Sequence, residues 1–265
     1  MTPDHISYSS LTSYDSCPRS YYLSRVKKAW SVPAWYFIVG TTVHAMIEQL
    51  LDPKSPDPSP ALLEEYFMDL VKQSMEVEPA TSKWLAGGSK ESPVIEERAL
   101  KLAQDCYAEA IVFLEDVDVH HVEHDVTGYL PGCSMEIKAF PDLIGEHSKH
   151  GLLIVDWKTG KSRQKDSVQL ETYNALYGKP GFKGMYVMLN PYGPNHKLVE
   201  FTRTPEEIGA VYADLEKKIQ SKVAKPNPNY MCKFCTMKPN CTTQSGKTQR
   251  AVYYDTPEQD GWFPF

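Results

Sequence analysis

The sequence lacks any apolar run long enough to cross a lipid bilayer, so we predict a globular protein without membrane association. Its first residues show no basic stretch followed by an apolar segment, so we expect no secretory signal and a cytoplasmic location. No segment resembles the phosphate loop G-x-x-x-x-G-K-[ST]. That absence excludes a nucleotide-driven motor of the P-loop class, and any such work would have to come from a partner.

Positive charge is also scarce, since 28 lysines and arginines face 34 aspartates and glutamates and leave a net charge of -6. Phosphate binding usually comes with a basic surface, so this balance argues against a nucleic-acid partner. A metal site built from carboxylates, however, lowers the net charge of a protein while local basic clusters remain. One such cluster is Lys158, Lys161, Arg163 and Lys165.

The first part of the chain carries helical patterns of apolar residues. These patterns predict helices over residues 9–28, 61–75 and 94–114, and a further helix that follows Gly40 with Thr41 or Thr42 as its N-cap. Pro18 lies inside the first of these segments and removes a backbone donor, so we expect a kink or a break there.

The middle of the chain changes to strand patterns. Alternation predicts strands over residues 117–129 and 133–140, joined as a hairpin at Pro131-Gly132. An apolar run predicts a buried central strand over residues 151–157. The remaining predicted elements are a helix over 167–177, strands over 184–189 and 197–202, and an amphipathic helix over 208–219.

These elements predict an α/β fold in three consecutive stretches. A helical N-terminal lobe covers residues 1–116, a mixed central sheet flanked by helices covers 117–225, and a cysteine-rich segment with an irregular tail covers 226–265. With 42% hydrophobic residues, the chain can bury a sizeable core as one large domain or one domain with an accessory lobe.

Two acidic residues and a lysine point to metal chemistry. Asp142 ends one predicted strand, and Asp156 and Lys158 share one face at the end of the next, because side chains alternate along a strand. If the two strands pair, Asp142 lies beside Asp156. Paired carboxylates bind Mg²⁺ or Mn²⁺, and such a metal with a nearby ammonium group suits phosphodiester hydrolysis. The alternative is an exposed strand pair, but the preceding apolar run favours a position near the core.

The same residues match a known superfamily. Pro141-Asp142 followed by Asp156-Trp157-Lys158 resembles the PD-(D/E)XK nucleases. Three further segments resemble the RecB-like exonuclease branch of that superfamily, from Gly40 to His44 with Glu48, from Phe140 to Ile144, and from Gln169 to Tyr173. A single PD…DXK pattern is common by chance, whereas four motifs in the family's order, between Ser9 and Cys241, are specific.

This resemblance implies a restriction-endonuclease-like fold and assigns roles to individual residues. The implied metal ligands are His44, Asp142, Asp156 and the main-chain carbonyl of Trp157. The implied catalytic residues are Lys158, Asp142, Asp156, and Gln169 and Tyr173, which would position the lysine or the DNA strand. Taken alone, His44 is more typical of a satisfied helix histidine. Glu48 lies one turn later on the same face and favours the ligand role, although Glu48 itself is equally typical of a helix surface.

Four of the six cysteines suggest a second metal site. Cys232, Cys235 and Cys241 form a C-x₂-C-x₅-C run, and Cys17 is the natural fourth ligand, since cytosolic chains rarely keep disulfides. The RecB-like branch contains members in which one early and three late cysteines hold a [4Fe–4S] cluster. Zinc is the alternative. We interpret Cys106 and Cys133 as packing residues.

The leading hypothesis is a metal-dependent DNA exonuclease with Mn²⁺ or Mg²⁺ and a structural [4Fe–4S] cluster, similar to CRISPR-associated RecB-like exonucleases and phage relatives. Its DNA would have free ends or single strands, and a homo-oligomer would help to retain it. The alternatives are a non-catalytic DNA-binding or assembly subunit and an iron–sulfur redox protein. Exposed aromatic residues would stack unpaired bases, with Tyr21, Tyr22, Trp30 and Trp35 as candidates that are also typical of a core. We interpret His120, His121 and His124 as strand residues.

Overall fold

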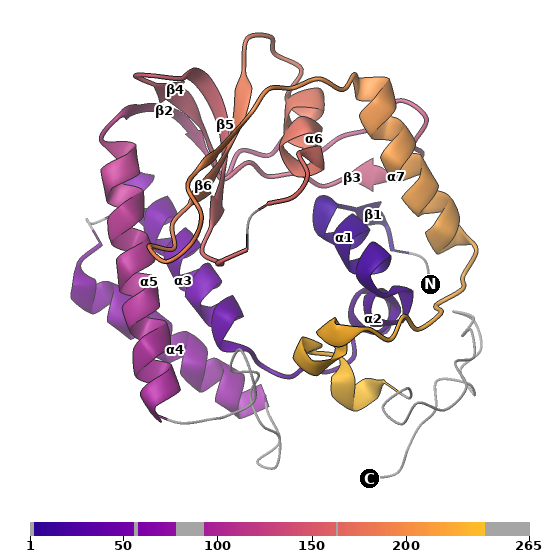
Figure 1. The fold of residues 1–265 in the computed structure, drawn as a ribbon, viewed down its shortest axis with the longest axis horizontal. Coiled ribbons are helices and arrows are strands. Elements are labelled where there is room, and N and C mark those ends of the chain that lie inside the picture. The colour runs from indigo at the N-terminus through magenta and orange to yellow at the C-terminus, as the bar shows by residue number, and fades with distance from the viewer. Residues whose placement is uncertain (1–2, 56–57, 78–92, 163, 242–265) are drawn as a thin grey trace. The chain divides into compact units, whose positions relative to one another are not determined.

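The computed structural model describes residues 3–55, 58–77, 93–162 and 164–241 (Figure 1). Contacts divide the chain into two compact units, each assembled from segments far apart in the sequence. The cysteine unit contains the described residues of Met1–Val32, Thr127–Ala139 and Arg203–Phe265, and the sheet unit contains those of Pro33–Val126 and Phe140–Thr202. The three consecutive stretches expected from the sequence remain a prediction.

The sheet unit is built around a mixed sheet of five strands in the order β2-β4-β5-β6-β7. These strands are β2 (Val117–Val122), β4 (Leu143–His147), β5 (Gly151–Lys158), β6 (Lys183–Met188) and β7 (Lys197–Val199). The central strand β5 pairs antiparallel with β4 and parallel with β6. Because β5 is paired on both edges and covered on both faces, its sequence is a continuous apolar run, as predicted.

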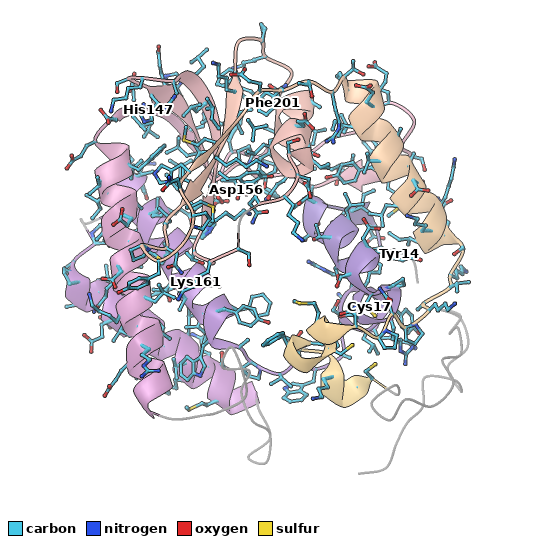
Figure 2. The ribbon with its side chains drawn as sticks, in the orientation of Figure 1. Tyr14, Cys17, His147, Asp156, Lys161 and Phe201 are labelled. Carbon is cyan, nitrogen blue, oxygen red and sulfur yellow. The ribbon has the colours of Figure 1, made fainter. Side chains whose placement is uncertain are left out.

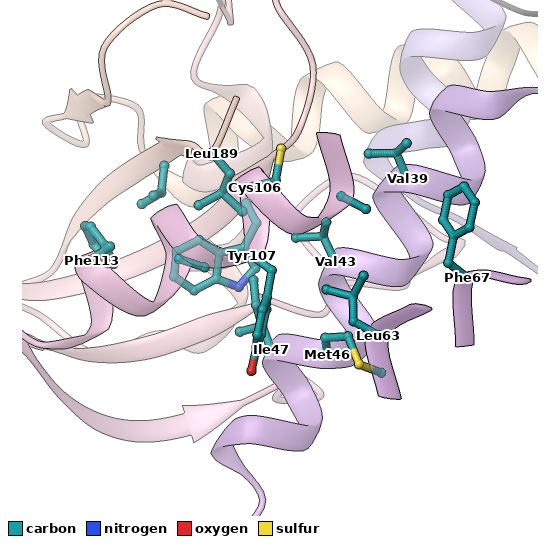
Figure 3. Packing of buried hydrophobic residues seen from close by; sticks show 14 of the residues in the cluster. Val39, Val43, Met46, Ile47, Leu63, Phe67, Cys106, Tyr107, Phe113 and Leu189 are labelled. Carbon is teal, nitrogen blue, oxygen red and sulfur yellow. The ribbon is translucent and has the colours of Figure 1, made fainter. Parts of the chain in front are cut away.

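Helices cover both faces of this sheet. The sheet unit contains α3 (Trp35–Leu51), α4 (Pro60–Val77), α5 (Pro93–Leu114) and α6 (Val168–Tyr177). The first three share a buried cluster with Leu153, Val155 and Trp157 of β5, whereas α6 contacts β5 and β6 (Figure 3 shows part of this cluster). Since alternate residues of β5 face opposite sides, Asp156 and Lys158 lie on the α6 side of the sheet.

Helix α3 begins earlier than the sequence predicted. We expected its start after Gly40, with a threonine cap, but it begins at Trp35 and is preceded by Ala34, whose side chain makes no capping hydrogen bond. The buried side chains of Trp35, Ile38 and Val39 extend the apolar stripe toward the N-terminus, and this burial outweighs the low helix propensity of Gly40.

The predicted hairpin over residues 117–140 is wrong. Strand β2 pairs antiparallel with β4, and β3 (Glu136–Ile137) pairs parallel with β1 (His5–Ile6). Between the two predicted strands only an isolated bridge joins Gly128 and Ile137. Alternation identifies a strand but does not select its partner. Here the fully buried Ile137 lies in the cysteine unit, while β2 belongs to the sheet unit.

The cysteine unit combines the N-terminal helices with the C-terminal part of the chain. Its helical elements are α1 (Tyr8–Ser16), α2 (Pro18–Tyr21), the π-helical turn η1 (Tyr22–Val26), α7 (Pro205–Gln220) and the 3₁₀ turns η2 (Tyr230–Phe234) and η3 (Lys238–Asn240). The predicted break at Pro18 is confirmed, since α1 ends before Cys17 and α2 begins at the proline. Tyr14 of α1 donates hydrogen bonds to the carbonyl oxygens of Lys218 and Val223.

The other predicted helices agree with the structure to within a few residues. The predicted irregular tail after residue 241 lies outside the described residues. Among the described helices, none combines the length and apolar character that a membrane span requires.

The β2–β4 pairing generates a prediction about stability. A Cβ atom added at Gly145 would lie 2.5 Å from the main-chain oxygen of Asp118 and 3.0 Å from Val117 Cγ1. Gly145→Ala should therefore destabilise the protein by about 1–3 kcal/mol and lower its urea unfolding midpoint. Gly160→Ala is the matched control, because a Cβ at Gly160 has no neighbour within 4 Å. Equal midpoints for both variants would contradict the prediction.

Candidate active site

Two buried carboxylates meet where β4 begins and β5 ends. Asp142 directly precedes β4, a strand that the sequence did not predict, and does not end the strand predicted over residues 133–140. The expected pairing of that predicted strand with the strand of Asp156 is wrong, since β5 pairs with β4, with Leu143 opposite Val155. The two carboxylates still lie at one place, because Asp142 stands at the start of β4. Asp142 and Asp156 are 8% and 3% exposed. The backbone N–H of Trp157 donates to Asp142 Oδ2 at 2.6 Å, which fixes this carboxylate against β5.

Helix α6 brings an amide and a phenol to the same place. Gln169 Nε2 donates to Asp156 Oδ1 at 2.5 Å and to the Tyr173 hydroxyl at 2.9 Å, and Gln169 Oε1 accepts from Lys158 Nζ at 3.0 Å. Lys158 Nζ lies 2.5 Å from Asp156 Oδ2 (Figure 2 labels Asp156). Gln169 therefore holds the carboxylate and the ammonium group together, and Tyr173 holds Gln169.

A second group of ligand atoms surrounds the other carboxylate. His44 Nδ1 of α3 lies 3.2 Å from Asp142 Oδ1. Glu123 follows β2 directly, and ligand atoms of His44, Glu123 and Asp142 all lie within 4.8 Å of one another. Within the described part of the chain, no other trio of histidine, cysteine or acidic ligand atoms is this close.

Burial and neighbouring charges shift the pKa values of Glu123, Asp156 and His44. Burial, with the Asp142 carboxylate nearby, raises the pKa of Glu123 to about 7. Burial also raises the pKa of Asp156 to about 6, although Lys158 opposes the shift. Burial lowers the pKa of His44, but the charge and hydrogen bond of Asp142 outweigh it and raise that pKa to about 9. The site thus concentrates more negative charge than its own cations neutralise.

These residues fit a divalent cation. The nearby atoms are carboxylate oxygens and one imidazole nitrogen, which suit Mg²⁺ or Mn²⁺. Asp156 Oδ2 is buried and lies 2.5 Å from Lys158 Nζ, so the ammonium group offsets part of its charge. A cation beside Asp156 and Asp142 would offset the negative charge that Lys158 and His44 leave uncompensated.

Glu123 is the site residue that the sequence reasoning missed. It follows a histidine-rich strand, and its φ of 45° places it in the left-handed region that few residues other than glycine adopt. Its backbone N–H donates to the carbonyl oxygen of Asp142 at 3.2 Å, which ties the end of β2 to the start of β4. Its place beside Asp142 depends on the pairing of β2 with β4, for which the sequence holds no local signal. Glu48, which from the sequence is equally typical of a helix surface, is exposed. Its charge further raises the pKa of Glu123.

Comparison with known proteins identifies the family. A family model described as the PD-(D/E)XK nuclease superfamily matches residues 5–242. The chain belongs to this superfamily. Its members are nucleases that use divalent metals such as Mg²⁺ or Mn²⁺, in agreement with the acidic site. The narrower resemblance to the RecB-like iron–sulfur branch remains a prediction.

Other comparisons add little to the superfamily assignment. No curated protein matches the sequence. Among solved structures, the crystal structure of SSO0001 is similar with 15% sequence identity and a TM-score of 0.39, over 78% of this chain and 95% of that one. A likeness at this level carries no argument about function.

Four cysteines in the cysteine unit lie in segments from both ends of the sequence. Cys17 separates α1 from α2, Cys232 lies in η2, and Cys235 and Cys241 end η2 and η3. Figure 2 shows Cys17 beside the segment that carries η2 and η3. Cys235 Sγ lies 3.7 Å from the Ser20 hydroxyl. Burial raises the pKa of the Cys235 thiol, and the nearby Cys17 and Cys241 raise it further.

Asparagine side chains fix the cysteine-rich segment. Asn227 donates its side-chain N–H to the Ser16 carbonyl at 3.0 Å and its backbone N–H to Cys17 Sγ at 3.4 Å. Asn229 caps η2 and donates its backbone N–H to Cys232 Sγ at 3.4 Å. Asn240 donates to the Trp30 carbonyl at 2.5 Å. Side-chain hydrogen bonds of asparagines thus help to order this polar segment.

The remaining sequence expectations have mixed outcomes. Cys106 is fully buried in the core, as expected, whereas Cys133 is partly exposed and its thiol donates to Glu216 at 3.2 Å. The aromatic residues Tyr21, Tyr22 and Trp35 are buried, so they offer no surface for bases, while Trp30 is partly buried. Of the three histidines, His120 and His121 lie in β2 and His124 follows it.

The uncompensated charge generates a prediction about metal binding. Without bound metal, Glu123→Gln should raise the melting temperature of the protein in EDTA. The substitution removes one of several carboxylates that repel one another and are partly desolvated. The same variant should show a smaller rise in melting temperature on addition of Mn²⁺. Thermal scans with and without Mn²⁺ measure both effects.

Glu146→Gln is the matched control, because Glu146 lies exposed in the neighbouring strand β4. It should leave both melting temperatures within a degree or so of those of the wild type. An unchanged Mn²⁺ response in Glu123→Gln would exclude Glu123 as a ligand.

Proposed function

We propose that the protein is a metal-dependent DNA exonuclease with a structural [4Fe–4S] cluster. The observation that carries the catalytic part is the buried pair Asp142 and Asp156 with Lys158 held beside them. A protein that only binds DNA has no need to bury two carboxylates at one point, since their mutual repulsion and desolvation destabilise the fold.

The proposed metal site uses residues from four separate segments. The proposed ligands are His44, Glu123, Asp142, Asp156 and the main-chain carbonyl of Trp157. When bound, a divalent cation supplies polarisation of the phosphate and a more acidic water. The fixed orientation of Asp142, through the Trp157 N–H, keeps its second oxygen turned toward His44 Nδ1.

The side chains of β5 and α6 carry the other roles. Hydrolysis adds water across a P–O ester bond, so that one product retains the phosphate and the other a hydroxyl group. Lys158 orients the attacking water or stabilises the negative charge that develops on the phosphate oxygens. Gln169 positions Lys158 through its carbonyl oxygen and Asp156 through its amide, and Tyr173 fixes the rotamer of Gln169. Gln169 and Tyr173 are therefore positioning residues.

Two features support DNA and its ends as the target. The superfamily acts on DNA, and the sequence resemblance to the RecB-like branch adds the expectation of an exonuclease. The part of the exonuclease proposal that concerns free ends rests on that resemblance alone.

The sequence resemblance to the RecB-like branch, in which one early and three late cysteines hold a [4Fe–4S] cluster, supports a cluster over a single zinc ion. Zinc is the alternative. The proposed ligands are Cys17, Cys232, Cys235 and Cys241.

The test of the catalytic proposal uses end-labelled linear DNA and a closed circular control with Mn²⁺, Mg²⁺ or EDTA. The wild type should degrade the linear DNA in the presence of metal only. Asp156→Ala should abolish cleavage, and Lys158→Ala should reduce the rate by about 10²–10³, because each removes charge stabilisation at the reacting phosphate. Asp118→Ala, at an exposed aspartate of β2, should retain full activity.

Cleavage of the circle would replace the exonuclease by an endonuclease. Activity in Asp156→Ala would overturn the assignment of the site. No cleavage with any metal, in protein that holds its cluster, would favour the alternative of a non-catalytic DNA-binding or assembly subunit.

The cluster proposal has its own prediction. Protein purified without oxygen should show broad absorbance near the visible range and contain about four irons per chain, and Cys235→Ser should lose both because one of four ligands is removed. Cys133→Ser should retain both, since Cys133 lies outside the cysteine group. Stoichiometric zinc in place of iron, measured by elemental analysis, would establish the zinc alternative.

A further inference from the structure

An exposed stripe runs along α3 toward the metal site. Near its N-terminal end, Tyr36 and Phe37 are 45% and 58% exposed, and their ring centroids lie 4.5 Å apart with 47° between the planes. Adjacent exposed aromatic rings are costly to hydrate and are depleted from surfaces without a partner. This pair directly follows the buried Trp35, which anchors the start of the helix.

The stripe connects this aromatic pair to the candidate active site. Tyr36, Gly40, His44 and Glu48 follow one another at four-residue spacing, so they share one face of the helix. With a rise of about 1.5 Å per residue, Tyr36 lies about 12 Å from His44 along the axis. Thr41 on the same side is exposed. Gly40 adds no side chain to this face between the rings and His44.

A loop that carries positive charge borders the stripe. A Cβ at Gly40 would lie 3.6 Å from Thr159 Oγ1, so the segment after β5 passes close to α3 at this point. Two residues further along the chain, the Lys161 ammonium lies 5.3 Å from the ring centroid of Tyr192, which is 72% exposed (Figure 2 labels Lys161). Cation–aromatic contacts of this kind place charge beside an open ring face.

The two loops are fixed to each other by a buried side chain. Asn190 is 3% exposed and donates its side-chain N–H to the Thr159 carbonyl at 3.0 Å, while its Oδ1 accepts from the backbone N–H of Tyr192 at 3.0 Å. The position of Tyr192 and Lys161 relative to Lys158 is therefore set by the fold of the sheet unit and not by chance surface packing.

We infer that Tyr36, Phe37, Tyr192 and Lys161 form a binding track for unpaired nucleotides that adjoin the phosphate being cleaved. This inference deepens the proposed function and rests on it. Exposed rings stack on bases of any sequence, and lysines between them meet the backbone phosphates. The separation of about 12 Å between Tyr36 and His44 corresponds to about three to four stacked nucleotides at about 3.4 Å each.

Charge favours a nucleic-acid strand over a protein as the occupant. The track combines aromatic rings with Lys161, which follows Lys158 by three residues, and the helix that carries Tyr36 also carries His44 beside the Asp142 carboxylate. A cation at the carboxylates would neutralise them when a phosphate binds. An apolar protein partner would leave these ammonium groups and the carboxylates without a complementary charge.

The first test measures binding of a fluorescent single-stranded thymidine oligonucleotide by anisotropy in EDTA, where cleavage is prevented. Phe37→Ala and Tyr36→Ala should each weaken binding by about 5- to 150-fold, the range that the loss of one stacked base produces. Phe37→Trp should retain the affinity. The matched control is Tyr129→Ala, which removes a 66% exposed aromatic ring from the cysteine unit and should bind as the wild type does.

Two further readouts identify the contacts. An oligonucleotide with abasic positions should bind the wild type and Phe37→Ala equally, because it lacks the bases that stack. Lys161→Gln should reduce the slope of the logarithm of the binding constant against the logarithm of the salt concentration by about one, since one phosphate contact is lost. Phe37→Ala should leave that salt dependence unchanged.

The outcomes separate this inference from the proposed function. Wild-type protein that neither binds nor cleaves DNA would overturn both. Wild-type protein that cleaves DNA, with Phe37→Ala and Tyr129→Ala binding alike, would overturn the track alone. If Phe37→Ala weakened the binding of normal and abasic oligonucleotides equally, the track would also be overturned, because the ring would then contact something other than a base.

Discussion

The burial of Asp156 in the central sheet is the constraint on which the site depends. A carboxylate that is 3% exposed needs compensation from its neighbours, and β5 and α6 provide it through Lys158 and Gln169. The hairpin of β4 and β5 then adds Asp142 at the same edge, although a second carboxylate opposes the first. The fold therefore holds like charges together where solvent cannot screen them. This arrangement is unfavourable for stability and useful only with a bound cation.

The sequence predicted this site more completely than it predicted the strands around it. Asp156 and Lys158 follow from local alternation and Asp142 from motif order alone, and the structure brings all three together. The pairing of Ile6 with Ile137 joins residues far apart in the chain, and local alternation contains no information about such a partner. The position of Glu123 depends in the same way on the pairing of β2 with β4, so its proximity to Asp142 could not be read from spacing.

Helix α3 shows how tertiary burial overrides local signals. A glycine followed by two threonines is typical of a helix start, yet Trp35, Ile38 and Val39 bury enough apolar surface to extend the helix by more than a turn. The extension has a consequence for function. It carries Tyr36 and Phe37 onto the same rigid helix as His44, so the spacing between the proposed base contacts and the proposed metal ligand is set by helix geometry.

The two proposed metal sites offer donors with different metal preferences. His44, Glu123 and Asp142 offer oxygen and imidazole nitrogen, which suit hard divalent cations, whereas the cysteine group offers only soft thiolates. The two sites also belong to different units of the chain, so neither shares a ligand with the other. The thiolates come from both ends of the sequence, and the contact of Asn227 with Cys17 already joins residues 210 positions apart. A cluster there would close that long loop and stabilise the cysteine unit without taking part in hydrolysis.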